Sequence, residues 1–291
     1  MADRAGAAGD QHGLSSDRPV AKQAAPRGHA GNAERRTGGK GNVVGQRRHQ
    51  IIGQRNGRAF GTAAEYIALA EHLVAALPDS LSFAQGATLG IPCMTAWCSL
   101  FCDGPIVGQT VLVTGGAGAV GHYAVQLAKW GGAKVIATVS SAAKAEQSRL
   151  AGADLVINYR SEDVVAKALA FTGQGGVNRV VDVDFGGNLA TTLKLMAMNS
   201  TIAIYATNGN RNPVVPVREL MERCIALRSL VLPALPPPLH AAAQADITKW
   251  LAAGTRLHNI AGQFALKDTA QAHLAVEKGD KLGTVIVDCA R

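Results

Sequence analysis

The chain has 291 residues, 47% of them hydrophobic and 17% charged, which is typical of a soluble globular protein with a sizeable core. Its formal net charge of +8 is uneven: residues 1–60 hold 11 Lys and Arg against 4 Asp and Glu (+7), and residues 61–291 hold 18 against 17 (+1). The nearly neutral remainder argues against a nucleic acid as the partner of the folded part.

Cysteine usage and apolar patterning indicate a reducing compartment and no membrane span. The five cysteines form no C-x-x-C pair, and an odd count argues against a disulfide framework. Cys98 and Cys102 lie one helical turn apart in an apolar stretch, which is typical of buried small hydrophobic residues. That stretch, residues 86–101, is shorter than the roughly 20 residues of a membrane span. No secretory signal is recognisable, so we expect a cytoplasmic protein.

Residues 1–53 differ from the rest of the chain. No aromatic residue or cysteine precedes Phe60, and Gly, Ala, Arg and Gln dominate without a lasting period. Such a segment buries too little apolar surface to offset its ordering entropy, so we expect it to be disordered. Three interpretations stay open: a solvated basic tail, a transit peptide or nucleic-acid arm, and a segment that is not the native start.

From Phe60 the pattern becomes that of a folded protein. Residues 62–69 predict a strand that runs into a turn. A helix is expected at residues 82–89, with Ser80 or Ser82 as its N-cap, and it continues in pieces through residues 95–101.

Residues 110–141 have the order of a βαβ unit that binds a dinucleotide. A buried strand at residues 111–113, a helix at 122–130 and a second strand at 135–139 enclose the glycines of residues 115–121. The early glycines allow a tight turn, Gly118 lets backbone approach a pyrophosphate, and Gly121 lets the helix pack against the strand. The phosphates would lie at the helix N-terminus. The alternative is a tight turn without a ligand.

Strands and helices continue to alternate after Ser141. Further strands are expected at residues 155–157, 179–183, 201–205 and 229–232. Further helices are expected at residues 142–150, 161–170 (capped by Ser161), 189–198, 216–224 and 241–253, with a break at residues 236–238. The alternation predicts an α/β fold with a doubly wound parallel sheet. Residues 258–287 show no further βαβ rhythm and are expected to return into another domain.

The end of the second strand indicates which dinucleotide binds. Sheets that select NAD place Asp or Glu there to hold the ribose 2′-hydroxyl. This chain has Ser140 and Ser141 instead, with Lys144 one turn on and Tyr159 and Arg160 after the third strand. Hydroxyls, a cation and a phenol suit a 2′-phosphate, and no carboxylate repels it, so NADP is favoured over NAD.

Other chemistry has little support in the sequence. Asp182 and Asp184 follow a strand at its carboxyl end, where they could line a site or cap the next helix. We expect no metal, because the ligand sets of structural and catalytic zinc are both missing. His122 is interpreted as a helix-face residue, and there is no nucleophile elbow.

Four stretches together resemble one enzyme family: GTAAEY (61–66), GIPCMTAW (90–97), GQTVLVTGGAGAVGHYAVQLAKWGGAKVIATVSS (108–141) and AGADLVINYRSED (151–163). They resemble the zinc-independent, zeta-crystallin-like quinone oxidoreductases of the medium-chain dehydrogenase/reductase superfamily. The tail LGTVIVD resembles the last strand of that family, with Thr284 in place of the usual Lys. The resemblance covers residues 54–291.

The resemblance implies a doubly wound Rossmann domain that binds NADPH, at residues 98–253, and an incomplete GroES-like, β-rich catalytic domain at residues 54–97 and 254–291. The implied activity is hydride transfer from NADPH to a quinone or related enone-type acceptor without zinc, in a homodimer formed through the sheet edge. The implied cofactor contacts are Thr95, Ala117, Gly118, Ala119, Val120, Gly121, Ser140, Lys144, Tyr159, Ala206, Thr207, Leu230, Val231 and Leu232.

Each part of the cofactor has its own contacts in this assignment. Residues 117–121 would hold the pyrophosphate, and Ser140, Lys144 and Tyr159 the 2′-phosphate. Thr95, the two residues after the fifth strand, and residues 230–232 on the sixth strand would line the nicotinamide. No catalytic residue or proton donor is assigned. Two alternatives remain: an enoyl or alkenal reductase of the same superfamily, and a non-catalytic protein that binds NADPH.

The N-terminal region departs from the family pattern. The family has a longer, strand-rich stretch before the GTAAEY position, and that stretch carries its Asn and Tyr substrate contacts. Here 60 residues precede Gly61, and none resembles those strands. We therefore expect residues 1–53 to be a frameshifted, mispredicted or otherwise replaced start.

Overall fold

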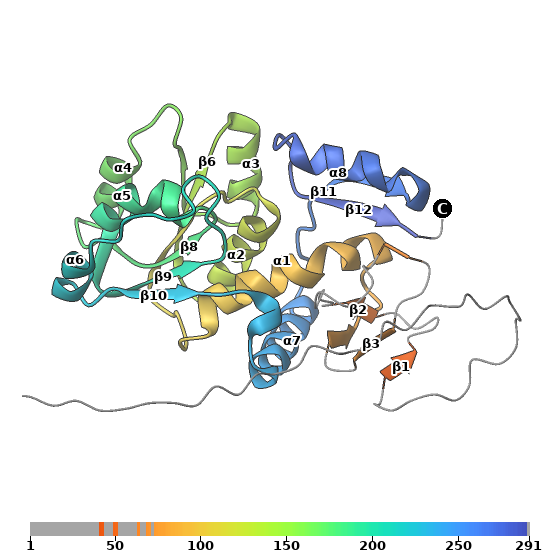
Figure 1. Ribbon diagram of the computed structural model, residues 1–291. Coiled ribbons are helices and arrows are strands. Elements are labelled where there is room, and N and C mark those ends of the chain that lie inside the picture. The colour runs from red at the N-terminus through yellow and green to blue at the C-terminus, as the bar shows by residue number, and fades with distance from the viewer. Residues whose placement is uncertain (1–40, 44–48, 52–62, 65–67, 71–72, 290–291) are drawn as a thin grey trace, which may run out of the picture. The chain divides into compact units, whose positions relative to one another are not determined.

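The computed structural model describes residues 41–43, 49–51, 63–64, 68–70 and 73–289 (Figure 1). Within the segment expected to be disordered, β1 (Gly41–Val43) and β2 (His49–Ile51) are strands, and the rest of residues 1–53 lies outside the described residues. β1 pairs antiparallel with β3 (Ala68–Ala70), and β2 pairs antiparallel with β4 (Val74–Ala76). Ladder bonds therefore connect part of the basic segment to the residues that follow it.

A six-stranded parallel sheet forms the centre of the fold. Its strands are β5 (Thr110–Val113), β6 (Lys134–Val139), β7 (Leu155–Asn158), β8 (Val177–Asp182), β9 (Met196–Ile204) and β10 (Ala226–Ser229). They lie in the order β10-β9-β8-β5-β6-β7, and all neighbours are parallel. The chain runs outward from β5 on one side and then from β8 on the other, so the predicted doubly wound α/β sheet is confirmed. Ligands of such sheets bind where the strand order reverses, here between β5 and β8.

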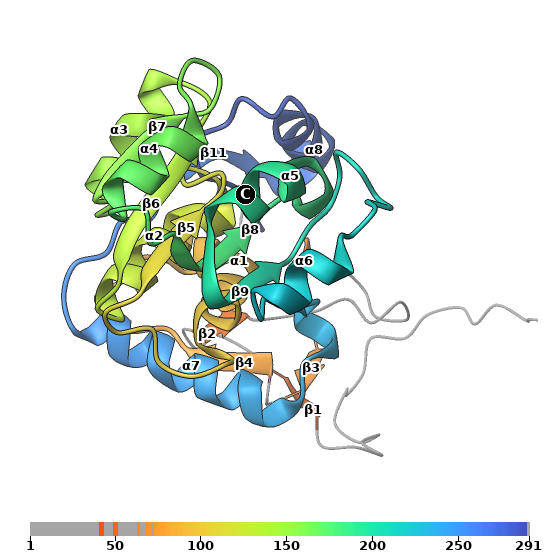
Figure 2. The same ribbon diagram turned by 90° about the vertical axis from the view of Figure 1, so that its left-hand side faces the viewer.

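Helices cover both faces of this sheet. They are α1 (Phe83–Phe101), α2 (Ala119–Trp130), α3 (Ala142–Leu150), α4 (Val164–Phe171), α5 (Phe185–Leu195), α6 (Val217–Glu222) and α7 (Pro237–Ala252). Figure 1 shows α4 and α5 on one side of the sheet and α1 and α2 on the other, and Figure 2 views the molecule from the side of α4 and α5. The period of two along β5 explains the two layers: Val111 and Val113 face one core cluster and Leu112 the other.

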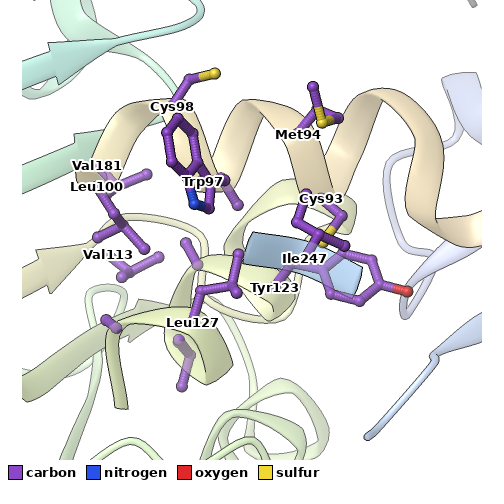
Figure 3. Packing of buried hydrophobic residues seen from close by; sticks show 14 of the residues in the cluster. Cys93, Met94, Trp97, Cys98, Leu100, Val113, Tyr123, Leu127, Val181 and Ile247 are labelled. Atoms are coloured by element: carbon purple, nitrogen blue, oxygen red, sulfur yellow. The ribbon is translucent and has the colours of Figure 1, made fainter. Parts of the chain in front are cut away.

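The larger core lies between α1, α2, α7 and the sheet (Figure 3). The apolar side chains that meet there include Trp97 from α1, Tyr123 and Leu127 from α2, and Ile247 from α7, all buried. Burial of a large apolar side chain contributes about 1.5–3 kcal/mol, so this layer is a main source of stability. Cys98 is buried in the same cluster, as expected of a small hydrophobic residue.

α1 begins and bends as its sequence predicts. Ser82 is the N-cap and forms a capping box with Gln85. The Gln85 N–H donates to the Ser82 hydroxyl, and the Ser82 N–H donates to Gln85 Oε1. Gly90 has non-helical dihedral angles, so the helix is made of two pieces. The domain boundary proposed between residues 97 and 98 falls inside the second piece and stays a prediction.

The starts of α4 and α5 differ from the prediction for reasons of tertiary structure. α4 begins at Val164 and is capped by the Asp163 side chain, not by Ser161, whose N–H donates to Asn158 in a turn after β7. α5 occupies Phe185–Leu195 instead of residues 189–198, because its first turn docks on the loop after β9 and Met196 already pairs with Val177 in the sheet. Tertiary contacts decide both boundaries.

The end of the sheet also differs from the prediction. β10 ends at Ser229, so Leu230, Val231 and Leu232 are not on the sixth strand. The strand gives way to a short 3₁₀ helix, η2 (Leu232–Ala234). The expected break at residues 236–238 is the start of α7, because proline lacks only an N–H that the first helical turn leaves unpaired.

The C-terminal region does contain a further βαβ unit, contrary to the prediction. β11 (Ile260–Ala265) and β12 (Thr284–Asp288) are parallel, and η3 (Leu266–Asp268) and α8 (Thr269–Glu277) connect them. β11 contains Gly262 and Gln263, which interrupt the apolar run by which a buried strand is recognised. These two strands form a separate sheet.

Candidate functional site

The turn between β5 and α2 requires glycine at two positions, Gly115 for its backbone conformation and Gly121 for its close contacts. Gly115 has φ +68°, which favours glycine, and its carbonyl accepts from the Gly118 N–H at 2.9 Å. A Cβ at Gly121 would overlap the Gly115 carbonyl oxygen and lie 3.0 Å from the Cα of Gly116. α2 therefore packs directly on the backbone of the turn.

The N-terminus of α2 is suited to an anion. The N-cap is Gly118, so no side chain caps the first N–H groups of the helix, and the first turn holds no acidic residue. The helix begins at Ala119, ahead of the predicted start, so Val120 and Gly121 belong to its first turn. Gly118 is exposed, whereas Ala117 and Gly121 are buried. Unpaired N–H groups and the helix dipole favour a phosphate at such a place.

Asp182 fixes this turn to the neighbouring strand end. Its buried Oδ1 accepts from the Thr114 hydroxyl at 3.0 Å, from the Asp184 N–H at 3.0 Å and from Asn188 Nδ2 at 2.7 Å. The Thr114 hydroxyl also accepts from the Val183 N–H at 2.9 Å. Burial raises the pKa of Asp182. Asp182 thus connects the ends of β5 and β8, where the strand order reverses. We call Asp182 with Thr114 and Asn188 the Asp182 clamp.

Asp184 and Thr207 connect the start of α5 to the loop after β9. Asp184 is the N-cap residue of α5, but its carboxylate accepts from the Gly209 N–H at 2.9 Å instead of capping the helix. The Thr207 hydroxyl accepts from the Gly186 N–H at 3.1 Å. The neighbouring Ala206 carbonyl accepts from the N–H of Phe185 at 3.0 Å. This loop is therefore held against the carboxyl ends of the strands.

A cavity of about 530 Å³ opens at these strand ends. Its walls include Thr114, Gly115, Thr138, Tyr159, Val183 and Asp184. Asp184 therefore lines a cavity next to the glycine turn, whereas Asp182 is buried and connects the strand ends.

The predicted 2′-phosphate residues lie close together. Lys144 Nζ donates to the Ser140 hydroxyl at 3.2 Å, and the Lys144 N–H donates to the N-cap hydroxyl of Ser141 at 3.3 Å. The N–H of Tyr159, which follows β7, donates to Val139 at 3.0 Å, next to Ser140 in the chain. The Tyr159 side chain is 53% exposed and therefore accessible to a ligand.

The residues assigned to the nicotinamide are spread over three elements. Thr95 is buried in α1. Ala206 and Thr207 follow β9, and residues 230–232 follow β10, where Leu230 and Leu232 are buried and Val231 is exposed. The Leu230 N–H donates to the carbonyl of Ile204 at 2.9 Å, which places the loop after β10 beside the end of β9.

A buried polar network was missed by the sequence reasoning. His122 lies on a buried face of α2: one ring nitrogen contacts the Leu257 carbonyl at 2.6 Å and the other contacts Asn259 Nδ2 at 3.1 Å. The Tyr123 hydroxyl contacts His258 Nδ1 at 2.9 Å. Burial, and then the charge of His122, lowers the pKa of His258 to about 4. The adjacent His and Tyr in an apolar helix were the signal, but partners this distant in sequence cannot be read from it.

No group of three or more His, Cys, Asp and Glu side chains among the described residues could share a metal ion. No helix there combines the length and apolarity needed to cross a membrane.

Comparisons with known proteins agree on one group of enzymes. Residues 119–245 match the family described as zinc-binding dehydrogenase. The human quinone oxidoreductase is 31% identical over 150 residues, which cover 51% of this chain and 46% of that protein. The tomato (Solanum lycopersicum) 2-methylene-furan-3-one reductase is 46% identical over 108 residues, 36% of this chain and 28% of that one. The chain thus spans about half or less of the length of these relatives.

Solved structures of similar fold cover more of the chain. The Escherichia coli quinone oxidoreductase in complex with NADPH superposes with a TM-score of 0.71 at 26% identity. The superposition covers 79% of this chain and 73% of that protein. The resemblance seen in the sequence motifs is therefore confirmed.

Proposed function

Because this chain is a relative of the quinone oxidoreductases of the medium-chain dehydrogenase/reductase superfamily, we propose that it is an oxidoreductase that uses NADPH without zinc. The observation that carries the proposal is the pairing of two features at one edge of the sheet: the backbone-packed glycine turn and the ammonium of Lys144 on Ser140. The first suits a pyrophosphate and the second a 2′-phosphate.

The residues present fit this cofactor. A side chain at Gly121 would overlap the backbone of the turn, and the positive φ of Gly115 favours glycine there, so backbone faces the anion site. No acidic residue lies in the first turn of α2 or of α3. Ser140 therefore stands where a carboxylate would repel a 2′-phosphate and select NAD. Tyr159 and the cavity lined by Val183 and Asp184 offer space for the adenosine half.

In the proposed reaction the bound NADPH supplies a hydride to a quinone or enone-type acceptor. The residues of this chain position the cofactor and the acceptor. The α2 N-terminus and residues 117–121 hold the pyrophosphate, and the Asp182 clamp keeps the turn in place. The loops after β9 and β10, which are hydrogen-bonded to neighbouring elements, would form the nicotinamide wall with Thr95. Precise holding of two reactants is itself a large part of catalysis.

A second candidate activity is supported by one comparison. The tomato enzyme, named 2-methylene-furan-3-one reductase, has the highest identity of the relatives described above. We therefore include reduction of an activated carbon–carbon double bond as the alternative to quinone reduction. A non-catalytic protein that binds NADPH remains the third candidate, because the family's substrate contacts lie in a region that residues 1–53 do not resemble.

The test is a binding measurement followed by a turnover measurement on the purified chain. NADPH fluorescence should increase and shift on binding, and NADPH should then be consumed with small quinones or small alkenals. Preference for the alkenals favours the alternative activity. Binding without turnover on either panel would contradict both enzyme proposals and leave the binding protein. No binding would contradict all three.

Two further proposals concern the assembly and its location. The resemblance implies a homodimer through the sheet edge, and β10 is an edge strand with four exposed residues. Light scattering of the purified chain should give twice the mass of one chain, and a monomer at micromolar concentration would contradict the dimer. The odd cysteine count without a C-x-x-C pair fits a cytoplasmic location, which fractionation of the source cells would test.

A further inference from the structure

The first turn of α3 carries a positive group. Lys144 Nζ donates to the Ser140 hydroxyl at 3.2 Å, and Ser141 caps the helix. The first turn of α3 holds no acidic residue. Helix N-termini already favour anions, and the ammonium adds a full charge there.

A contact from the C-terminal region reaches the same helix. Asn259, just before β11, donates from Nδ2 to Gln147 of α3 at 2.6 Å, three residues after Lys144. The Thr284 N–H donates to the Asn259 carbonyl at 2.8 Å. The segment before β12 is thereby held against α3.

Lys281 lies in this segment, and its side chain is turned back along it. Lys281 Nζ donates to the Gly283 carbonyl at 3.0 Å. Gly283 has φ +105°, and a Cβ there would overlap the Asn259 carbonyl oxygen, so only glycine permits this approach. The Lys281 ammonium is thus held next to the contact between Asn259 and α3.

The charge of Lys144 acts on the ammonium group of Lys281. The pKa of Lys281 is lowered, first by burial and then by the charge of Lys144. Neither lysine forms an ion pair with a carboxylate of the described residues. Two like charges brought together without an anion cost free energy, which an anion between them would recover. A phosphomonoester, with a charge of about −1.5 to −2 at neutral pH, suits both lysines.

We propose that Lys281 joins Lys144 in binding the 2′-phosphate of NADPH, so that the C-terminal βαβ unit helps to select this cofactor. The inference rests on the proposed function and adds a specificity residue from outside the Rossmann sheet. It also couples cofactor binding to the contact between Asn259 and α3.

Two ligands without a nicotinamide test the proposal by calorimetry: adenosine 2′,5′-bisphosphate and adenosine 5′-monophosphate. Lys281→Gln should weaken binding of the bisphosphate by about ten-fold, the effect of one charge-assisted hydrogen bond, and leave the monophosphate nearly unchanged. Lys144→Gln should act in the same way. Lys278→Gln, an exposed lysine at the end of α8, is the matched control and should change neither affinity.

Four results separate the proposal from its premise. Lys281→Arg keeps the charge and should bind both ligands as the unaltered chain does. An equal loss in Lys281→Arg and Lys281→Gln would mean that packing matters and charge does not, which overturns the inference. The ratio of the affinity for the bisphosphate to that for the monophosphate could stay unchanged in Lys281→Gln and fall in Lys144→Gln. That result would overturn the role of Lys281 and leave the proposed function standing. Failure of the unaltered chain to bind the bisphosphate would overturn the proposed function as well.

Discussion

The closed position at Gly121 gives a prediction whose size follows from the structure. In Gly121→Ala the new methyl group would overlap the Gly115 carbonyl oxygen and lie 2.9 Å from its carbon and 3.0 Å from the Cα of Gly116. All three are backbone atoms, so no side chain can rotate away and the turn itself must move. Overpacking of this kind costs about 1–3 kcal/mol. At roughly 2–4 °C per kcal/mol for a chain of this size, Tm should fall by several degrees.

Gly118→Ala is the graded control. Its methyl group would lie 3.2 Å from the Gly115 carbonyl oxygen, a contact that a small shift relieves. Gly118 is exposed, so its methyl group would obstruct a pyrophosphate without unsettling the fold. The Tm of Gly121→Ala should therefore lie well below that of Gly118→Ala. NADPH titrations should show weaker binding in both variants than in the unaltered chain. A Gly121→Ala chain with unchanged Tm and unchanged NADPH affinity would refute the reasoning.

Three further substitutions test the electrostatics. Ser140→Asp should reverse the preference for NADPH over NADH in paired titrations; an unchanged ratio would contradict the 2′-phosphate assignment. Asp103→Asn should destabilise the chain by about 2 kcal/mol at neutral pH, because Arg179 is buried and loses its carboxylate partner. Burial alone would raise the pKa of Asp103, but hydrogen bonds from Arg228 and Arg179 outweigh it and lower the pKa, so this stabilisation is lost as pH falls below about 4. In denaturant unfolding, the difference in free energy of unfolding between the unaltered chain and Asp103→Asn should become smaller in acid. A difference that does not change with pH would contradict this role of the Asp103 carboxylate. For His258 the folded pKa of about 4 lies below the ordinary value of 6.5, so stability should fall as pH decreases through that window. His258→Gln should flatten this dependence, and an unaltered pH profile would exclude His258 as its source.

The sheet was predictable because its signal is local. Strands buried on both faces must be apolar throughout, and the runs at Val111–Val113 and at Val135–Val139 read as such without knowledge of their neighbours. The glycine turn was predictable for the same reason, since Gly115, Gly118 and Gly121 act on one another within a single turn. Proximity of Ser140 and Lys144 follows from helical spacing.

What the sequence could not supply depends on distant contacts. The start of α5 at Phe185 is set by a hydrogen bond to the loop after β9. The burial of His122 is set by Leu257 and Asn259, far along the chain. Lys281 reads as an ordinary surface lysine until the parallel pairing of β11 with β12 brings its segment to α3. In each case the local pattern is compatible with several partners, and the fold selects one.

We propose that NADPH binds at the carboxyl ends of the strands, between the glycine turn and Lys144. The most direct measurement is a pair of fluorescence titrations of the purified chain, one with NADPH and one with NADH, at the same ionic strength. We predict saturable binding of NADPH that is at least about ten-fold tighter than that of NADH, the expected contribution of a charge-assisted phosphate contact. Equal affinities, or no binding of either nucleotide, would contradict it.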